Sequence, residues 1–130
     1  DCVMDPWYSL GSGDMLEVAQ MGLHVGQMTS QAAMRQCFDA VTVNPARILG
    51  LEGYGLEPGC RADFVLLQAR DPIEALRLRA TRLAVVRAGR CIARSPAATS
   101  SLNLPGRPVE TAFMPPVPVA TSAIPEARTP

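Results

Sequence analysis

The apolar positions in the first part of the chain recur at helical spacing. Between residues 14 and 28, one stripe repeats every three or four positions and consists of Met15, Val18, Met21, Val25 and Met28, widened by Leu23. Asp14 precedes this stripe and Glu17 follows three residues later, which is the spacing of a capping box with Asp as the cap. The pattern predicts a helix from Asp14 to about Met28 whose stripe faces the core.

Two further helices are predicted before residue 51. Thr29 or Ser30 can cap a helix that runs to about Thr42. The core face of this helix would consist of Met34, Cys37, Phe38 and Val41. A short helix then follows, in which the cap, first-turn and stop residues would be Asn44, Pro45 and Gly50. The first half is therefore predicted to be mostly helical.

The second half predicts short strands separated by turns. Residues 51–60 are rich in Gly and Pro and end at Pro58-Gly59, a type II turn signal. The apolar run Phe64–Leu67 predicts a buried strand. A hairpin is expected from residues 82–93, with Ala88-Gly89 as its two-residue turn.

A fourth helix and a tail complete the predicted elements. Asp71-Pro72-Ile73-Glu74 supplies a cap, a first-turn Pro and a third-position acid, and the helix would reach about Arg79. Eight of the twelve prolines lie between Pro96 and Pro130. We expect residues 99–104 to form one edge strand and the rest of this segment to be a disordered or extended tail.

Composition narrows the class of protein. The 12 basic residues, all Arg, balance 12 acidic ones, which argues against a nucleic-acid or anionic-membrane partner. We expect the arginines at positions 79, 82, 87 and 90 to form a solvated face of the hairpin. The four cysteines, Cys2, Cys37, Cys60 and Cys91, form no CxxC pair, which favours a reducing cytoplasm over a disulfide framework. With no secretory leader and no apolar span visible, we expect a soluble cytoplasmic protein.

Candidate chemistry is confined to the first residues. A carboxylate such as Asp1 can bind a metal or move a proton, and the pair Trp7-Tyr8 can wall a flat ligand. The single histidine, His24, lies inside the first predicted helix, so no zinc-ligand set is apparent. Taken by themselves, these residues leave solvated surface as the simpler interpretation of Asp1.

Several runs resemble a known family. The run Asp1-Cys2-Val3-Met4-Asp5-Pro6-Trp7-Tyr8, followed by residues 9–11, 14–16 and 21–25, is similar to cytosine deaminase of the amidohydrolase superfamily. Residues 44–51, 58–65 and 85–92 resemble the C-terminal pattern shared across that superfamily. The similarity covers roughly residues 1–104 in order.

The resemblance implies an α/β fold. The chain would be the C-terminal fragment of a metal-dependent hydrolase (β/α)8 (TIM) barrel, namely the loop after strand 8 and the following helices, with the closing strands of a small β-sandwich. Residues 1–50 would then end the barrel and residues 51–104 would complete the sandwich subdomain. Residues 105–130 would be the Pro-rich tail.

The resemblance also implies a reaction and a site. Iron or zinc would activate water to attack the amino-bearing carbon of cytosine, leaving uracil and ammonia. Asp1 falls on the aspartate that binds the metal and moves a proton, and Trp7 falls on an aromatic residue beside the base pocket. Cys2, also at that pocket, replaces an acid common in cytosine deaminases, which leaves the choice among cytosine, isocytosine, creatinine and triazine-type rings open.

The resemblance also implies histidine ligands for the metal, and these histidines do not occur in this chain. We therefore expect the chain alone to be inactive and to hold no metal. Its expected partners are a small pyrimidine or related ring, an N-terminal barrel partner and, as in many family members, further copies of the enzyme. Two alternatives stay open: a split subunit that completes a separately encoded barrel, or a non-catalytic interaction module.

Overall fold

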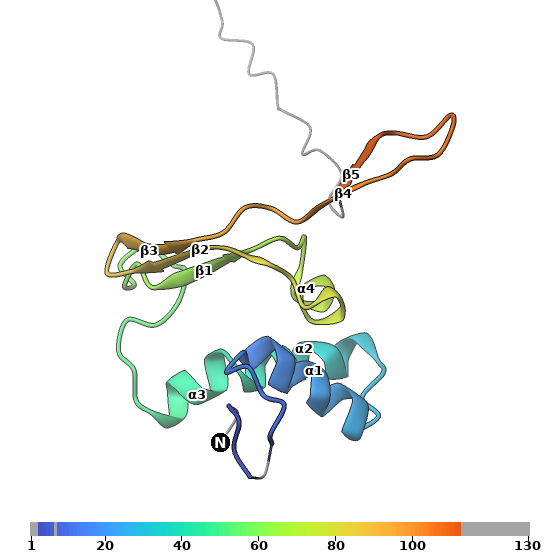
Figure 1. Cartoon of the computed structure of the whole chain (residues 1–130). Helices are drawn as coiled ribbons and strands as arrows, with labels where there is room; N and C mark the ends of the chain where they lie inside the picture. Colours follow the sequence, from blue (N-terminus) through green and yellow to red (C-terminus); the bar gives the residue numbers. More distant parts are fainter. Residues whose placement is uncertain (1–2, 7, 113–130) are drawn as a thin grey trace, which may run out of the picture.

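A computed structural model describes residues 3–6 and 8–112. Three helices form one layer and a three-stranded sheet forms a second, with a fourth helix between them at one end and a separate two-stranded hairpin projecting from the sheet (Figure 1). The elements are α1 (Met15–Val25), α2 (Gln31–Ala40), α3 (Val43–Ile48), β1 (Phe64–Leu67), α4 (Pro72–Leu78), β2 (Arg82–Arg87), β3 (Arg90–Arg94), β4 (Thr99–Ser101) and β5 (Glu110–Ala112). The α/β class is thus confirmed. Among the described residues, no helix has the length and apolar character that crossing a membrane requires.

Side-chain caps begin three of the helices as predicted. Asp14 accepts the Leu16 amide at 2.8 Å, Ser30 accepts the Ala33 amide at 3.2 Å, and Asp71 accepts the Glu74 amide at 2.9 Å. The third helix differs from the prediction: α3 begins at Val43 after Thr42, whose side chain makes no capping hydrogen bond. Asn44 therefore lies inside the first turn and is not the cap.

Glu74 is a buried acid whose carboxylate accepts hydrogen bonds from Arg70. Its carboxylate accepts the Arg70 guanidinium at 2.7 Å and the Arg70 amide at 2.8 Å. These hydrogen bonds lower the pKa of Glu74 to about 2, and the burial of the side chain opposes them. Glu74 thus acts at the start of α4 as the third-position acid that the sequence predicted, although it satisfies the amide before the cap.

Residues in the left-handed conformation end three helices. Gln27 follows α1, Gly50 follows α3, and Arg79 follows α4, with φ values of 51°, 60° and 47°. After α1, the Met28 amide donates to Leu23 O at 2.9 Å and the Gln27 amide donates to His24 O at 3.2 Å, which is the Schellman pattern. The chain therefore leaves α1 after Val25, three residues before the predicted end.

The predicted core face of α1 is correct only in part. Leu23 and Met28 of the predicted stripe pack against the core. Leu16 and Ala19, outside that stripe, are buried, whereas Met15, Met21 and Val25 are 47%, 44% and 79% exposed. Apolar residues occur on several sides of this helix, so periodicity alone did not choose the face that meets α2 and α4. The face predicted for α2 is borne out, since Cys37 is buried and packs with the partly buried Phe38 and Val41.

Leu76 is the centre of the core. It is the largest fully buried side chain among the described residues, with 0% exposure, and it packs with Leu16, Ala19 and Cys37. Leu67 at the end of β1 packs against the same cluster. Because α4 connects β1 to β2, its insertion against α1 and α2 joins the sheet to the helical layer.

The sheet has the antiparallel order β1-β2-β3 and includes the predicted hairpin. Ala88 and Gly89 both have positive φ, 48° and 73°, as a type I′ turn requires. The Asp63 carboxylate accepts the Ala88 amide at 2.5 Å, and Gly89 donates its amide to Ala62 O at 3.1 Å. The residues before β1 therefore hold the turn between β2 and β3.

The sheet is less buried than its sequence predicted. Phe64, Val65 and Leu66 are 40%, 47% and 54% exposed, so the interpretation of β1 as a buried strand is wrong for these three residues. Helix α4 lies on one face of the sheet and reaches only the end of β1 near Leu67. No described element covers the opposite face.

Order also extends beyond the predicted edge strand. β4 pairs with β5 from Thr99–Ala112 to Ser101–Glu110, so residues 99–112 form a hairpin whose second strand falls within the segment expected to be a tail. Buried Gln68 ties the connection to the sheet by exchanging two hydrogen bonds of 2.8 Å with the backbone of Ala98. The part of the expected tail from residue 113 to 130 lies outside the described residues.

Replacing Leu76 tests the shared core. We expect Leu76→Ala to lower the free energy of unfolding by about 3 kcal/mol, because it leaves a cavity where α4 meets α1 and α2. Urea denaturation of the chain measures the change. Leu56→Ala is the control, since Leu56 is 85% exposed; equal losses in both variants would contradict this description of the core.

Replacing Ala88 tests the hairpin turn. Glycine has no Cβ to strain at positive φ, so we expect Ala88→Gly to raise the free energy of unfolding by about 1 kcal/mol. Ala93→Gly in β3 is the matched control and should not stabilise the chain. Thermal denaturation compares the two, and a lower melting temperature for Ala88→Gly would exclude a type I′ turn.

Candidate functional site

The three residues that the sequence analysis assigned to a site, Asp1, Cys2 and Trp7, lie outside the described residues. Their roles stay predictions. The structure does describe the segment that connects them to α1, which we call the candidate loop (residues 3–6 and 8–13) (Figure 1). Its geometry determines how firmly the neighbouring candidates can be held.

Backbone contacts close the candidate loop on itself. Val3 and Ser12 form an antiparallel bridge, so the two ends of the loop lie together. Within it, the Tyr8 amide donates to Asp5 O at 3.0 Å and the Gly11 amide donates to Tyr8 O at 3.3 Å. The chain then turns into α1 at Gly13, whose φ is 76° and where a Cβ would lie 3.1 Å from the Val3 side chain. The segment is a compact closed loop of the kind that often carries functional residues.

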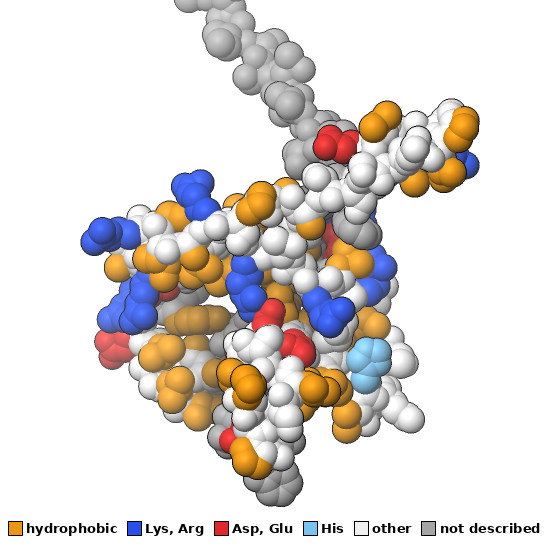
Figure 2. Space-filling view, in the orientation of Figure 1, with side chains coloured by type: hydrophobic (Ala, Val, Ile, Leu, Met, Phe, Trp, Pro, Cys, Tyr) orange, Lys and Arg blue, Asp and Glu red, His pale blue; other side chains and the backbone are white. Residues whose placement is uncertain are grey.

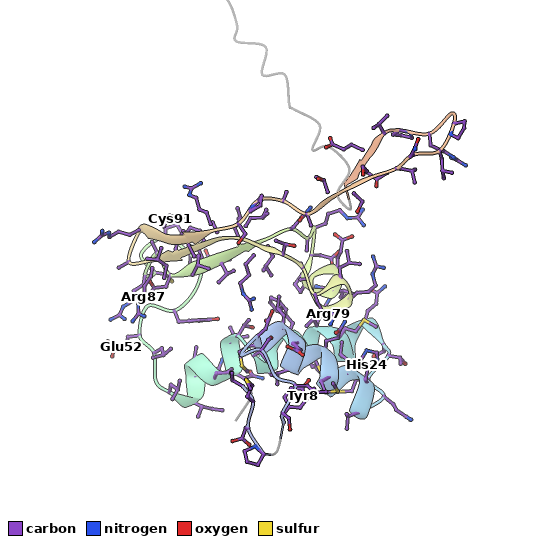
Figure 3. The ribbon with its side chains drawn as sticks, in the orientation of Figure 1. Tyr8, His24, Glu52, Arg79, Arg87 and Cys91 are labelled. Carbon is purple, nitrogen blue, oxygen red and sulfur yellow. The ribbon has the colours of Figure 1, made fainter. Side chains whose placement is uncertain are left out.

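Glu17 fastens this loop to the first turn of α1. Its Oε1 accepts the Tyr8 hydroxyl at 3.3 Å and its Oε2 accepts the Ser12 hydroxyl at 2.5 Å. Figure 3 shows Tyr8 beside α1, away from the sheet. The Ser12 hydrogen bond, followed by that of Tyr8, lowers the pKa of Glu17 below its usual value, because both bonds favour the ionised carboxylate.

Asp14 and Arg82 hold the start of α1 against the sheet. The guanidinium of Arg82 forms a two-pronged ion pair with the Asp14 carboxylate, with one contact, from Nη1 to Oδ2, at 2.8 Å. Burial acts to raise the pKa of Asp14, but the hydrogen bonds from Arg82 and from the Leu16 amide outweigh it and lower the pKa. The expectation that Arg82 lies on a solvated face is therefore wrong.

The described residues by themselves do not fit a metal site. Within residues 3–6 and 8–112, no group of three or more His, Cys, Asp or Glu side chains could hold a metal ion. His24 is exposed in the last turn of α1 (Figure 3). Among the described cysteines, Cys37, Cys60 and Cys91 are free thiols.

A shallow hollow lies apart from the candidate loop. It encloses about 390 Å³ between α3 and the following turn, and Val43, Arg47, Glu52 and Tyr54 contribute to its wall. None of its lining residues belongs to the candidate loop or to the Asp14–Arg82 pair. We therefore place the candidate site at the loop.

The arrangement can position a reacting group, although no described residue performs a complete reaction. Two carboxylates of α1 have separate tasks, since Asp14 contacts the sheet and Glu17 contacts the loop. The capping-box spacing pointed to both carboxylates but not to their partners Tyr8, Ser12 and Arg82. A capping pattern indicates where a helix begins and does not indicate which distant side chain will meet its acids.

Comparison with known proteins finds a matching protein family and a similar enzyme. Residues 1–93 match the model of a family described as the amidohydrolase family. The chain is 33% identical over 95 residues to N-isopropylammelide isopropyl amidohydrolase of Pseudomonas sp. strain ADP, which covers 72% of the chain and 24% of that protein.

Solved structures with similar folds include two enzymes. The crystal structure of 5-methylcytosine deaminase from Klebsiella pneumoniae with 5-fluorocytosine matches with a TM-score of 0.70 and 35% identity, covering 82% of this chain and 26% of that one. N-isopropylammelide isopropylaminohydrolase from Burkholderia multivorans matches with a TM-score of 0.66 and 39% identity, covering 71% and 24%. The chain thus spans about a quarter of the length of these relatives.

Substitutions of Asp14 test how the site is anchored. Asp14→Ala removes a cap and an ion pair, and we expect it to lower the free energy of unfolding by about 2 kcal/mol at pH 7. Asp14→Ser keeps a capping oxygen, so about half of the loss should remain. Asp39→Ser is the control, because the side chain of Asp39 on α2 is exposed. Equal stability of wild type and Asp14→Ala at pH 7 would contradict the assignment.

The same substitutions have a defined pH dependence. The folded state lowers the pKa of Asp14 below 3.8, so its carboxylate contributes stability above that pH. This contribution is lost as the pH falls through the lowered pKa. The difference between wild type and Asp14→Ser in urea midpoint should therefore shrink on acidification, and a growing difference would contradict the ion pair.

Proposed function

This chain belongs to the amidohydrolase family, and we propose that it forms the C-terminal quarter of a metal-dependent hydrolase that replaces the amino group of cytosine, or of a related ring, with oxygen from water. The family is generally metal-dependent, and its members cleave C–N bonds by hydrolysis. The match to 5-methylcytosine deaminase, with 35% identity and a TM-score of 0.70, is the observation that carries the proposal.

The relatives' names point to one kind of chemistry. One deaminates 5-methylcytosine and the other removes an isopropylamino group from isopropylammelide. In both cases an amine leaves a carbon atom and water supplies its replacement. The run Asp1 to Tyr8 favours the cytosine branch, so we propose cytosine as the substrate and triazine-type rings as the nearest alternative.

Asp1, Cys2 and Trp7 carry the proposed roles. Asp1 would be a metal ligand and would transfer a proton between water and the ring, the role of a general acid–base carboxylate. Trp7 would stack against the flat ring, and Cys2 would line the pocket beside it. The described residues supply no complete ligand set, so the remaining ligands of the iron or zinc ion would come from the other three-quarters of the enzyme.

The exposed apolar surface supports a larger enzyme. Apolar side chains gather between the helical and sheet layers on the face seen in Figure 2. Ile48 at the end of α3 and the following Leu49 are 84% and 70% exposed, and the sheet exposes Phe64 to Leu66. Large apolar side chains exposed in this number often meet another protein surface. We propose that the barrel covers these side chains, either in the same polypeptide or as a separately encoded subunit, and that the isolated chain is inactive.

A hybrid enzyme tests the proposed reaction. In this hybrid, the chain replaces the segment of Klebsiella pneumoniae 5-methylcytosine deaminase that it matches. We expect metal-loaded hybrid to release ammonia from cytosine. Asp1→Asn should lower kcat by about 10²- to 10⁴-fold, the usual contribution of a general acid–base group, because the amide cannot carry the proton.

Two controls make the hybrid experiment decisive. Asp39→Asn changes an exposed acid of α2 and should leave kcat unchanged. The 130-residue chain incubated alone with iron or zinc should give no sustained ammonia release. Full activity of the Asp1→Asn hybrid would overturn the role of Asp1, and turnover by the isolated chain would overturn the need for a barrel.

A further inference from the structure

We propose that Glu17 is the positioning residue of the candidate loop: by accepting the hydroxyls of Tyr8 and Ser12, it restrains residues 3–6 and 8–13, to which Asp1 and Trp7 are joined in sequence. This inference rests on the proposed function, because it concerns the placement of the same site. Glu17 touches neither substrate nor metal in this proposal, and acts through the residues that it holds.

The two hydrogen bonds restrain the loop at different points. The Tyr8 hydroxyl, 3.3 Å from Oε1, anchors the middle of the loop next to Trp7 in sequence. The Ser12 hydroxyl, 2.5 Å from Oε2, anchors the closing end. Ser12 also forms the backbone bridge with Val3. The hydrogen bond from Ser12 to Glu17 therefore restrains Val3 as well, which follows Asp1 and Cys2 in sequence. One carboxylate therefore restrains both limbs.

Glu17 is itself held on a firm support. It lies in the first turn of α1, whose start is capped by Asp14 and paired with Arg82 of β2. The neighbouring Leu16 is buried against Leu76 in the core. The backbone of Glu17 is therefore held in place by the helix and the core. Hydrogen bonds to its side chain consequently restrain the loop relative to the core.

Removing Glu17 should loosen the loop while the rest of the fold is kept. Glu17 is only half-buried and belongs to no buried cluster of the core. Enzymes lose up to about 10²-fold in rate when catalytic groups are displaced by about 1 Å. Displacement of Trp7 would raise KM, whereas displacement of Asp1 would lower kcat, so the split between the two parameters shows which limb moves.

Hydrogen exchange of the full chain tests the restraint without any activity. The amides of Tyr8 and Gly11 donate within the loop. We expect Glu17→Ala to lower their protection about tenfold, in keeping with the loss of a hydrogen bond to a charged group, while the Met34 amide of α2 keeps its protection. Glu17→Gln retains an acceptor oxygen and should restore part of it, and Glu52→Ala is the exposed control. Unchanged protection in Glu17→Ala would overturn the inference.

Kinetics of the hybrid enzyme test the consequence. Glu17→Ala should lower kcat/KM about tenfold or more, and Glu17→Gln should recover part of the loss. If protection falls while kcat and KM stay unchanged in an active hybrid, Glu17 holds the loop but does not position the site, and the inference is wrong. Failure of the proposed function has a different signature, namely a hybrid that is indifferent to Asp1→Asn.

Discussion

The burial of Leu76 is the contact on which the rest of the structure depends. Helix α4 connects two neighbouring strands, yet it packs against α1 and α2, so the helical layer and the sheet share one core. A three-stranded sheet with an exposed apolar face has little stability of its own. Because α4 attaches the sheet to the helical layer, β2 is held in place. Arg82 of β2 can then form its ion pair with Asp14 at the start of α1.

This support explains how the candidate loop is held although Val3, Met4 and Leu10 in it are exposed and contribute little buried surface. Asp14 joins α1 to the sheet, Glu17 joins the loop to α1, and the Val3–Ser12 bridge closes the loop. Each link is an exposed or half-buried polar contact of modest strength, so their value lies in acting together on one turn of helix. In the proposed function, this loop would adjoin a surface that the rest of a larger enzyme completes.

The sequence predicted local features well and tertiary ones poorly. The caps at Asp14, Ser30 and Asp71, the stop at Gly50 and the Ala88-Gly89 turn depend on a few adjacent residues and were correct. The buried side of α1 and the exposure of β1 depend on what packs against them, which apolar spacing does not encode. The predicted α3 cap was wrong because the helix begins at Val43, one residue before Asn44, and the hydroxyl of Thr42 donates to Phe38 O of α2 instead of capping α3. For the site, the resemblance selected Asp1, Cys2 and Trp7, whereas the link from Glu17 to Tyr8 and Ser12 required the fold.

Asp1 is the residue through which we propose that this chain contributes to an active site. Anomalous diffraction from crystals of the hybrid enzyme, recorded at the absorption edge of the bound iron or zinc, tests this most directly. The account predicts a metal peak about 2.0–2.2 Å from an Asp1 carboxylate oxygen, the usual distance for such a ligand, with the Tyr8–Glu17 contact retained. A metal ion bound elsewhere, with the Asp1 carboxylate turned to solvent, would contradict it.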